Sequence, residues 1–140
     1  MTKQMNKSDL IVIRDYTPED KNFVLATWLR GLYYGDSVYS NMKKQTFMEN
    51  YHTILETVIN NSAIQIKVAC LKEDSNVILG YAVLANAPQT IHWVFVKKFW
   101  RNIGLARDLV PKDTNTVTNL TKIGLSILKK KDWAFNPFLV

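Results

Sequence analysis

The chain has 140 residues, 47% of them hydrophobic, so it has the size of one domain and enough apolar side chains for a sizeable core. Eighteen basic and twelve acidic residues give a net charge of +6, which suits an anionic partner such as a nucleotide cofactor, a nucleic acid or an acidic protein. No apolar run approaches the ~20 residues that span a bilayer, and the polar start MTKQMNKSDL lacks the apolar segment of a signal peptide, so we expect a soluble, cytoplasmic protein. Cys70 is the only cysteine, which excludes an internal disulfide or a thiolate metal cluster and predicts a small buried side chain. No metal site is predicted.

The first half of the chain predicts one strand followed by two helices. Residues 10–16, LIVIRDY, are rich in β-branched side chains, and the following TPED carries helix-start signals. Apolar residues at helical spacing predict a helix over residues 18–33 that stops near Gly31 or Gly35. A loop, YYGDSVYSN, then leads to a second amphipathic helix over residues 41–60. The apolar face of this second helix contains Phe47, Tyr51, Ile54 or Leu55, and Val58.

The second half of the chain is mostly predicted strand. AIQIKVACL and VILGYAVLAN, joined by the turn KEDSN, read as a β-hairpin, and QTIHWVFVKK supplies a further long strand that is apolar on both faces near its end. A short helix over residues 101–110, a strand in TNTVTNL, a helix in TKIGLSILKKK and a final strand in WAFNPFLV complete the chain. The order β-α-α-β-β-β-α-β-α-β contains no repeat or linker. It predicts one α/β (α+β) domain over residues 1–140, with a mixed sheet between helices on both faces.

A lone glycine, Gly104, stands between the predicted long strand and the short helix, in the segment VKKFWRNIGLA. Glycine lets the backbone come close to a ligand, and the N–H groups that open a helix favour an anion. Arg101 adds positive charge beside them. The pattern R-x-x-G-x-A therefore predicts a phosphate on this turn, although an ordinary helix start can have the same pattern.

The same segment resembles the acetyl-CoA loop of the GCN5-related N-acetyltransferase (GNAT) superfamily, in which a valine and four variable residues precede R/Q-x-x-G-x-G/A. The order of elements resembles that superfamily as well. The resemblance implies the GNAT fold and an N-acetyltransferase that moves an acetyl group from acetyl-CoA, its co-substrate, directly to an amine of a small molecule or protein. The backbone of residues 94–96 would pair with the pantetheine arm and stabilise a tetrahedral intermediate. Asn102 and Ala106 stand where glycine is common. The cofactor-binding residues implied by the resemblance are Val94, Phe95, Val96, Arg101, Asn102, Ile103, Gly104, Leu105, Ala106, Arg107 and Thr121.

The C-terminal part of the chain departs from this superfamily. Its members often end with N-x-x-A-x-x-L-Y-x-K-x-G-F, in which the tyrosine hydroxyl can protonate the departing CoA thiolate. Laid on TKIGLSILKKKDW, the pattern puts Thr121 at the asparagine and Leu128 at the tyrosine, and leucine has no proton to give. Either another group or water supplies the proton, or acetyl transfer is lost. The alternative function is therefore a catalytically inactive GNAT-fold protein, virion-associated or not, that docks to a protein or nucleic acid.

His92 is the predicted general base, because an acceptor amine must be neutral to attack and His92 lies on the strand that leads to the loop. The competing interpretation is a hydrogen-bonded histidine in a half-buried strand. Simple alternation along the strand predicts two faces, one with His92, Val94 and Val96 and the other with Ile91, Trp93 and Phe95.

The loop between the first two helices occupies the place where the superfamily usually forms its acceptor wall. Aromatic hydroxyls suit amphipathic ligands, and a carboxylate suits a cationic substrate. The substrate-binding residues implied by this position are Tyr33, Tyr34, Asp36 and Tyr39, with Asp36 as the carboxylate. Packing of the tyrosines over the sheet explains these aromatic residues equally well.

The absent tyrosine and the ending NPFLV resemble small GNAT-like proteins encoded by tailed bacteriophages. That resemblance implies the cytoplasm of a host cell and makes a host protein or a virion component a candidate partner, with a homodimer left open. The basic run LKKKDW reads as a solvated helix end, so nucleic acid is the less expected partner, and no membrane partner is predicted.

Overall fold

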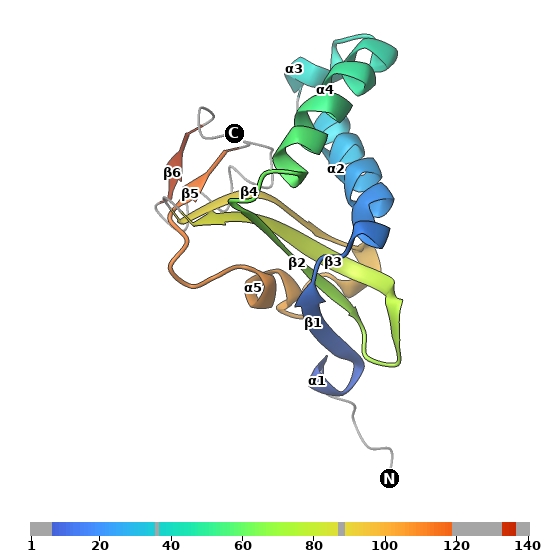
Figure 1. Ribbon diagram of the computed structural model, residues 1–140, viewed down its shortest axis with the longest axis vertical. Helices are drawn as coiled ribbons and strands as arrows, with labels where there is room; N and C mark the ends of the chain where they lie inside the picture. The colour runs from blue at the N-terminus through green and yellow to red at the C-terminus, as the bar shows by residue number, and fades with distance from the viewer. Residues whose placement is uncertain (1–6, 36, 87–88, 119–132, 137–140) are drawn as a thin grey trace.

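The computed structural model describes residues 7–35, 37–86, 89–118 and 133–136 (Figure 1). Within these residues a six-stranded sheet has the strand order β1-β2-β3-β4-β5-β6. The elements in chain order are α1 (Lys7–Leu10), β1 (Ile11–Asp15), η1 (Pro18–Asp20), α2 (Lys21–Gly35), α3 (Ser37–Ser40), α4 (Lys44–Ile59), β2 (Ile64–Leu71), β3 (Asp74–Asn86), β4 (Gln89–Val96), η2 (Lys98–Trp100), α5 (Leu105–Leu109), β5 (Thr116–Val117) and β6 (Ala134–Phe135).

The sheet is mixed, as the sequence predicts. Strands β1 to β4 pair antiparallel with their neighbours, whereas β5 runs parallel to β4 and β6 runs parallel to β5. Helices α2 and α4 cover one face of the sheet and α5 lies on the other (Figure 1). The predicted strand, helix pair, hairpin and long strand are confirmed in this order. The helix predicted in TKIGLSILKKK lies outside the described residues.

Two apolar clusters fill the space on either side of the sheet, and burial of such side chains is the main force that holds helix to sheet. The first, the α2-face cluster, has as its buried members Val24, Leu25, Trp28, Leu29, Leu32, Phe47, Leu55, Val58, Ile66, Val68, Ile78, Tyr81 and Val83. The second, the α5-face cluster, contains Ile11, Ala69, Leu79, Ala82, Leu84, Ile91, Val96, Leu105, Leu109 and Val117.

Three local expectations need correction or refinement. On α4 the buried residue is Leu55, because Ile54 is 41% exposed. The predicted loop between the long helices contains the short helix α3. There the Tyr39 ring packs on Phe47, and the backbone closes into a turn in which Met42 N–H donates to the Tyr39 carbonyl at 3.0 Å. The hairpin turn is shorter than predicted, since β3 begins at Asp74, opposite Leu71 of β2.

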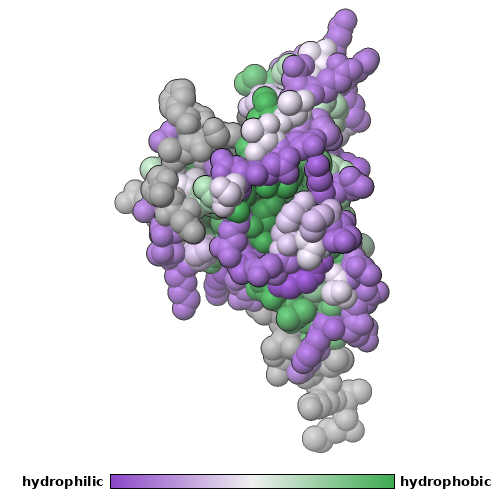
Figure 2. Space-filling view, in the orientation of Figure 1, coloured by the Kyte–Doolittle hydropathy of each residue, from purple (hydrophilic) through white to green (hydrophobic). Residues whose placement is uncertain are grey.

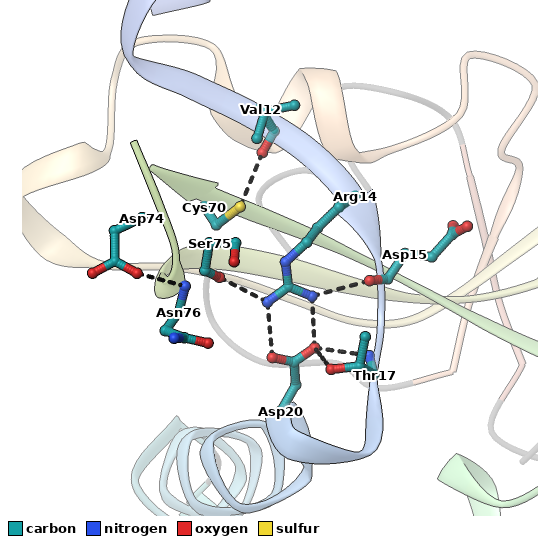
Figure 3. Close-up of polar contacts among 9 residues, drawn as sticks. All are labelled: Val12, Arg14, Asp15, Thr17, Asp20, Cys70, Asp74, Ser75 and Asn76. Carbon is teal, nitrogen blue, oxygen red and sulfur yellow. Dashed lines mark hydrogen bonds and ion pairs between the residues drawn. The ribbon is translucent and has the colours of Figure 1, made fainter. Parts of the chain in front are cut away.

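A cluster of polar contacts, which we call the Arg14 clamp, holds the start of α2 against the sheet (Figure 3). Arg14 donates from Nη1 and Nη2 to the two carboxylate oxygens of Asp20, at 2.7 and 2.9 Å. It also donates to the carbonyls of Asp15 and Ser75, at 3.0 and 2.9 Å. The same carboxylate accepts the backbone N–H of Thr17 at 2.8 Å. These hydrogen bonds, of which the one from Arg14 has the largest effect, hold the pKa of Asp20 below its usual range although the residue is buried.

Polar residues dominate the face of the molecule shown in Figure 2, while hydrophobic residues gather over the sheet below α4 and at β1. Val12 and Ile13 of β1 have exposed fractions of 43% and 38%. None of the helices in the described ranges is long and apolar enough to cross a membrane.

Candidate functional site

A β-bulge adds one residue, His92, to β4 and so changes which face of the sheet the neighbouring side chains occupy. Val83 of β3 lies opposite Trp93, and the next residue, Leu84, lies opposite Ile91, so His92 is an extra residue on β4. The strict alternation predicted for the strand is therefore wrong at Ile91. Because of the inserted residue, Ile91 packs with Val94 and Val96 in the α5-face cluster, whereas Trp93 and Phe95 pack against the α2-face cluster.

The bulge also changes which backbone groups of β4 face β3. Lys97 N–H donates to the carbonyl of Leu79, the residue directly opposite, at 2.8 Å. In an antiparallel ladder such pairs alternate, so the N–H and C=O groups of Phe95 also face β3 while those of Val94 and Val96 face away. Phe95 therefore contributes backbone to the β3 ladder, and its ring packs in the core 5.6 Å from that of Tyr81.

Strand β5 leaves this edge of β4 early. Within the described residues β5 pairs with β4 only at Thr90 and Ile91, and Thr118 N–H donates to the Ile91 carbonyl at 3.2 Å. Beyond that point no described strand pairs with Val94 or Val96. Among the described residues the second half of β4 therefore has a free edge, on which an extended ligand can form backbone hydrogen bonds.

His92 lies where β4 and β5 separate. Its side chain is 3% exposed, and Nδ1 lies 2.9 Å from the hydroxyl of Thr118. Burial lowers the pKa of His92, which keeps the imidazole neutral at pH 7. These contacts agree with the hydrogen-bonded strand histidine that was one interpretation of the sequence, and a role as general base stays a prediction.

The free edge continues into residues 101–106, which we call the motif loop. Helix α5 begins only at Leu105, so the helix predicted from residue 101 is too long at its start. The reason is backbone conformation: Asn102 has φ 67° and Gly104 has φ 81°, and left-handed residues cannot continue a right-handed helix. Asparagine tolerates this region better than other side chains, which explains Asn102 where glycine is common.

The motif loop presents backbone N–H groups without partners in the helix. The first helical bond runs from Asp108 N–H to the Gly104 carbonyl at 3.1 Å, which leaves the N–H groups of Leu105, Ala106 and Arg107 without an intrahelical acceptor. The N-cap residue of α5 is Gly104, which has no side chain that could cap these N–H groups. A left-handed residue followed by a right-handed one turns successive N–H groups into a concave anion site. The loop therefore has the donors that a phosphate needs.

Arg101 connects the two parts of the site. Its Nε donates to the carbonyl of Val96 at 2.9 Å, so the side chain lies at the end of the free edge. The residue is otherwise exposed, which leaves the outer guanidinium nitrogens at the surface. Val94, Val96 and the motif loop thus form one continuous stretch of the structure, while Thr121 lies outside the described residues.

Only part of the predicted acceptor wall is exposed at the surface of the molecule. Tyr33 donates to the Met42 carbonyl at 3.0 Å and packs on Phe47, and Tyr39 accepts a 2.6 Å hydrogen bond from Tyr51. These two tyrosines pack over the α2-face cluster, which was the alternative explanation for them. Tyr34 is 63% exposed, and Asp36 lies outside the described residues.

Two features of the site were missed in the sequence. Trp93, next to the bulge, packs so closely on α2 that a Cβ at Gly31 would lie 2.4 Å from its ring, so Gly31 is needed inside the helix rather than at its end. Phe99, in η2 just before the motif loop, is 95% exposed. The run KKFWR, an aromatic pair between cations, was the signal that could have drawn attention to Phe99.

Comparison with known proteins rests on solved structures. No family model matches the sequence, and no curated protein matches it. A candidate acetyl transferase from Pyrococcus furiosus superposes with a TM-score of 0.59 and 14% identity, over 90% of this chain and 80% of the other. The GCN5-related N-acetyltransferase from Rhodopseudomonas palustris superposes with a TM-score of 0.50 and 21% identity, over 76% of this chain and 64% of that one. The chain has the GNAT fold. Identities this low establish the fold alone, and these two source organisms give no support to a bacteriophage origin.

Proposed function

We propose that the chain binds acetyl-CoA and transfers its acetyl group directly to an amine of a small molecule or protein. The observation that carries this proposal is the free edge of β4, which opens after the bulge at His92 and leads directly into the motif loop. A free strand edge that leads directly into an anion site suits a ligand with amide groups at one end and phosphates at the other. Acetyl-CoA has this construction and supplies a thioester whose acetyl group an amine can accept.

Each part of the site has a defined task in this proposal. The outward N–H and C=O groups of Val94 and Val96 bind the amides of the pantetheine arm as an added strand would. The N–H groups of Leu105 to Arg107 bind the pyrophosphate, and Arg101 adds charge next to them. A backbone N–H near Val94 stabilises the oxyanion that develops as the amine attacks.

Proton transfer is assigned to His92 on the acceptor side. The lowered pKa leaves its imidazole unprotonated at neutral pH, as a base must be. Because the residue is 3% exposed, the proton of the amine reaches it through an intervening hydroxyl or water. On the thiolate side Leu128 cannot donate, so water or another group protonates the leaving CoA.

The first experiment is calorimetric titration with acetyl-CoA and with CoA, followed by a thiol-release assay with a panel of small amines and amine-bearing peptides. We expect micromolar binding of both ligands and release of thiol with at least one acceptor. A rise in melting temperature with ligand concentration follows from binding to the folded state alone. Absence of binding heat and of a thermal shift at millimolar ligand would falsify the proposal.

The second function to be tested is a GNAT-fold binding module without catalysis. The residue that favours it is Leu128 at the usual tyrosine position. Binding of acetyl-CoA without thiol release from any acceptor is the result expected for this alternative. Thiol release that depends on His92 excludes it.

A further inference from the structure

Phe99 is an exposed aromatic side chain in a position that the backbone fixes. It lies in η2, where Trp100 N–H donates to the Lys97 carbonyl at 2.9 Å and Arg101 N–H to the Lys98 carbonyl at 3.4 Å. The next residue, Trp100, packs against the α5-face cluster and anchors the turn. Phe99 itself belongs to neither apolar cluster and is 95% exposed. Packing of the core therefore does not account for a phenylalanine here.

The charged residues next to Phe99 in the chain are all positive. Residues 97–107 contain four basic residues and no acidic one. The side chain of Lys97 turns away, with Nζ 5.2 Å from the centre of the Phe23 ring, but Lys98 and Arg101 are exposed on either side of Phe99. An open aromatic face between cations matches a planar base that carries phosphate groups, since bases stack on aromatic rings and cations neutralise phosphates.

We propose that Phe99 is a stacking platform for the adenine ring of a nucleotide whose diphosphate lies on the motif loop, and that Lys98 pairs with a phosphate on its ribose. This inference rests on the proposed function, because it needs phosphate on the motif loop. On this inference the chain recognises the nucleotide end of its acyl donor as well as the pantetheine arm. The motif loop begins at Arg101, two residues after Phe99, so the ring and the loop are parts of one surface.

The test compares three ligands that differ only at the nucleotide end, titrated into the full chain. They are CoA; dephospho-CoA, which lacks the ribose phosphate; and 4′-phosphopantetheine, which lacks the adenosine part, the ribose phosphate and one phosphate of the diphosphate. For the unmodified chain we expect affinity to fall in that order. Phe99→Leu keeps the apolar bulk and removes the aromatic face, so it should weaken CoA binding about tenfold and leave 4′-phosphopantetheine unchanged. Phe99→Trp should restore CoA affinity, and Lys98→Gln should make CoA and dephospho-CoA equal.

Phe135→Leu is the matched control, because Phe135 is an exposed phenylalanine, 42% exposed, on β6. Its CoA affinity should equal that of the unmodified chain. Unchanged CoA affinity in Phe99→Leu, or equal affinity of the unmodified chain for CoA and 4′-phosphopantetheine, overturns the platform and leaves the proposed function standing. No binding of CoA at all removes the proposed function and the platform with it. Loss of binding to a single-stranded oligonucleotide in Phe99→Leu, with CoA binding intact, assigns the ring to nucleic acid instead.

Discussion

The Arg14 clamp and the motif loop use the same chemical groups, an arginine and backbone N–H groups at the start of a helix, with opposite results. In the clamp, Arg14 makes hydrogen bonds to the Asp20 carboxylate and to two backbone carbonyls. That carboxylate also accepts a backbone N–H at the start of the helix, from Thr17. In the motif loop, Arg101 donates to the Val96 carbonyl, and the N-cap residue of α5, Gly104, has no side chain that could accept an N–H.

This difference indicates what the motif loop lacks. Asp20 supplies the anion for the clamp from within the chain, so its donors are satisfied without a ligand. The motif loop has comparable donors, and under the proposed function its anion is a phosphate of the ligand. The clamp is therefore expected to act on stability, and the motif loop on ligand affinity. Variants at the two regions can separate these effects.

The largest effect on affinity is expected for Gly104→Val. A β-branched residue is strained at φ 81° and projects toward the N–H groups of the loop. Loss of two hydrogen bonds to a charged group, at about 1.5 kcal/mol each, weakens acetyl-CoA binding about 100-fold. Calorimetry measures the affinity and circular dichroism the fold. Asn102→Gly, which keeps a left-handed residue at φ 67°, is the control and should bind normally. Full affinity in a folded Gly104→Val would show that the phosphates bind elsewhere.

The complementary change is Arg14→Met in the clamp. It leaves the buried Asp20 carboxylate without its main partner and should lower the free energy of unfolding by about 3 kcal/mol, measured in urea. Replacing both residues, as in Arg14→Met with Asp20→Leu, should restore part of this loss because no buried charge is left. Affinity for acetyl-CoA should not change in either variant. A parallel fall in affinity would mean that the two regions are coupled and that the comparison is wrong.

A smaller loss of stability is expected for Gly31→Ala on α2, where the glycine packs against Trp93 of β4. The added Cβ would meet the Trp93 ring at 2.4 Å, so α2 or the ring must move, at a cost of about 1–3 kcal/mol. The double variant Gly31→Ala with Trp93→Leu should recover much of this loss, as measured by urea denaturation. If Gly31→Ala is as stable as the unmodified chain, the close packing of Trp93 on α2 is not a constraint on the bulge.

The dependence of stability on pH should show two separate falls. The pKa values of His92 and Asp20 are both lowered in the folded state, so each contributes stability above its unfolded pKa and loses it as pH falls through the folded value. For His92 the loss begins as pH drops below about 6.5, and for Asp20 below about 3.9. In urea titrations across pH, His92→Gln should remove the first fall, and Asp20→Asn should reduce the second, to which Glu19 and Glu56 also contribute because their pKa values are lowered too. His52→Gln, on the exposed face of α4, is the control and should keep both.

The sequence predicted the element order, the mixed sheet and the loop after β4, because hydrophobic periodicity and local glycine and proline signals determine these features. It did not predict the bulge at His92. Bulges depend on the pairing of two strands, and the strand QTIHWVFV alone has no signal for the extra residue. The error at Ile91 follows directly from that, since one inserted residue reverses the faces of the strand.

The remaining discrepancies also come from tertiary contacts. Tyr33 and Tyr39 could be placed in the loop region by sequence, but only packing on Phe47 shows that they point inward. The sequence left Gly31 and Gly35 as possible helix ends; α2 ends at Gly35, and contact with Trp93 requires a small residue at Gly31 within the helix. The Arg14 clamp joins β1, a helix start and the beginning of β3, and Ser75 lies 61 positions from Arg14 in the chain. Sequence spacing contains no information about such a contact.

The smallest effect is expected for Arg101→Ala, the counterpart of Arg14 in the motif loop. Its guanidinium is exposed and makes one hydrogen bond, to the Val96 carbonyl, so stability should change little. An exposed ion pair with phosphate is worth about 0.2–1 kcal/mol, which predicts a roughly 1.4- to fivefold loss of acetyl-CoA affinity. Because salt screens exposed charges, this loss should be larger at 20 mM than at 500 mM sodium chloride. The Debye length is about 20 Å at the lower concentration and about 4 Å at the higher one. Arg30→Ala, an exposed arginine on α2, is the matched control and should bind normally at both concentrations. Equal losses at low and high salt would show that Arg101 acts by holding the Val96 carbonyl in place and not by its charge.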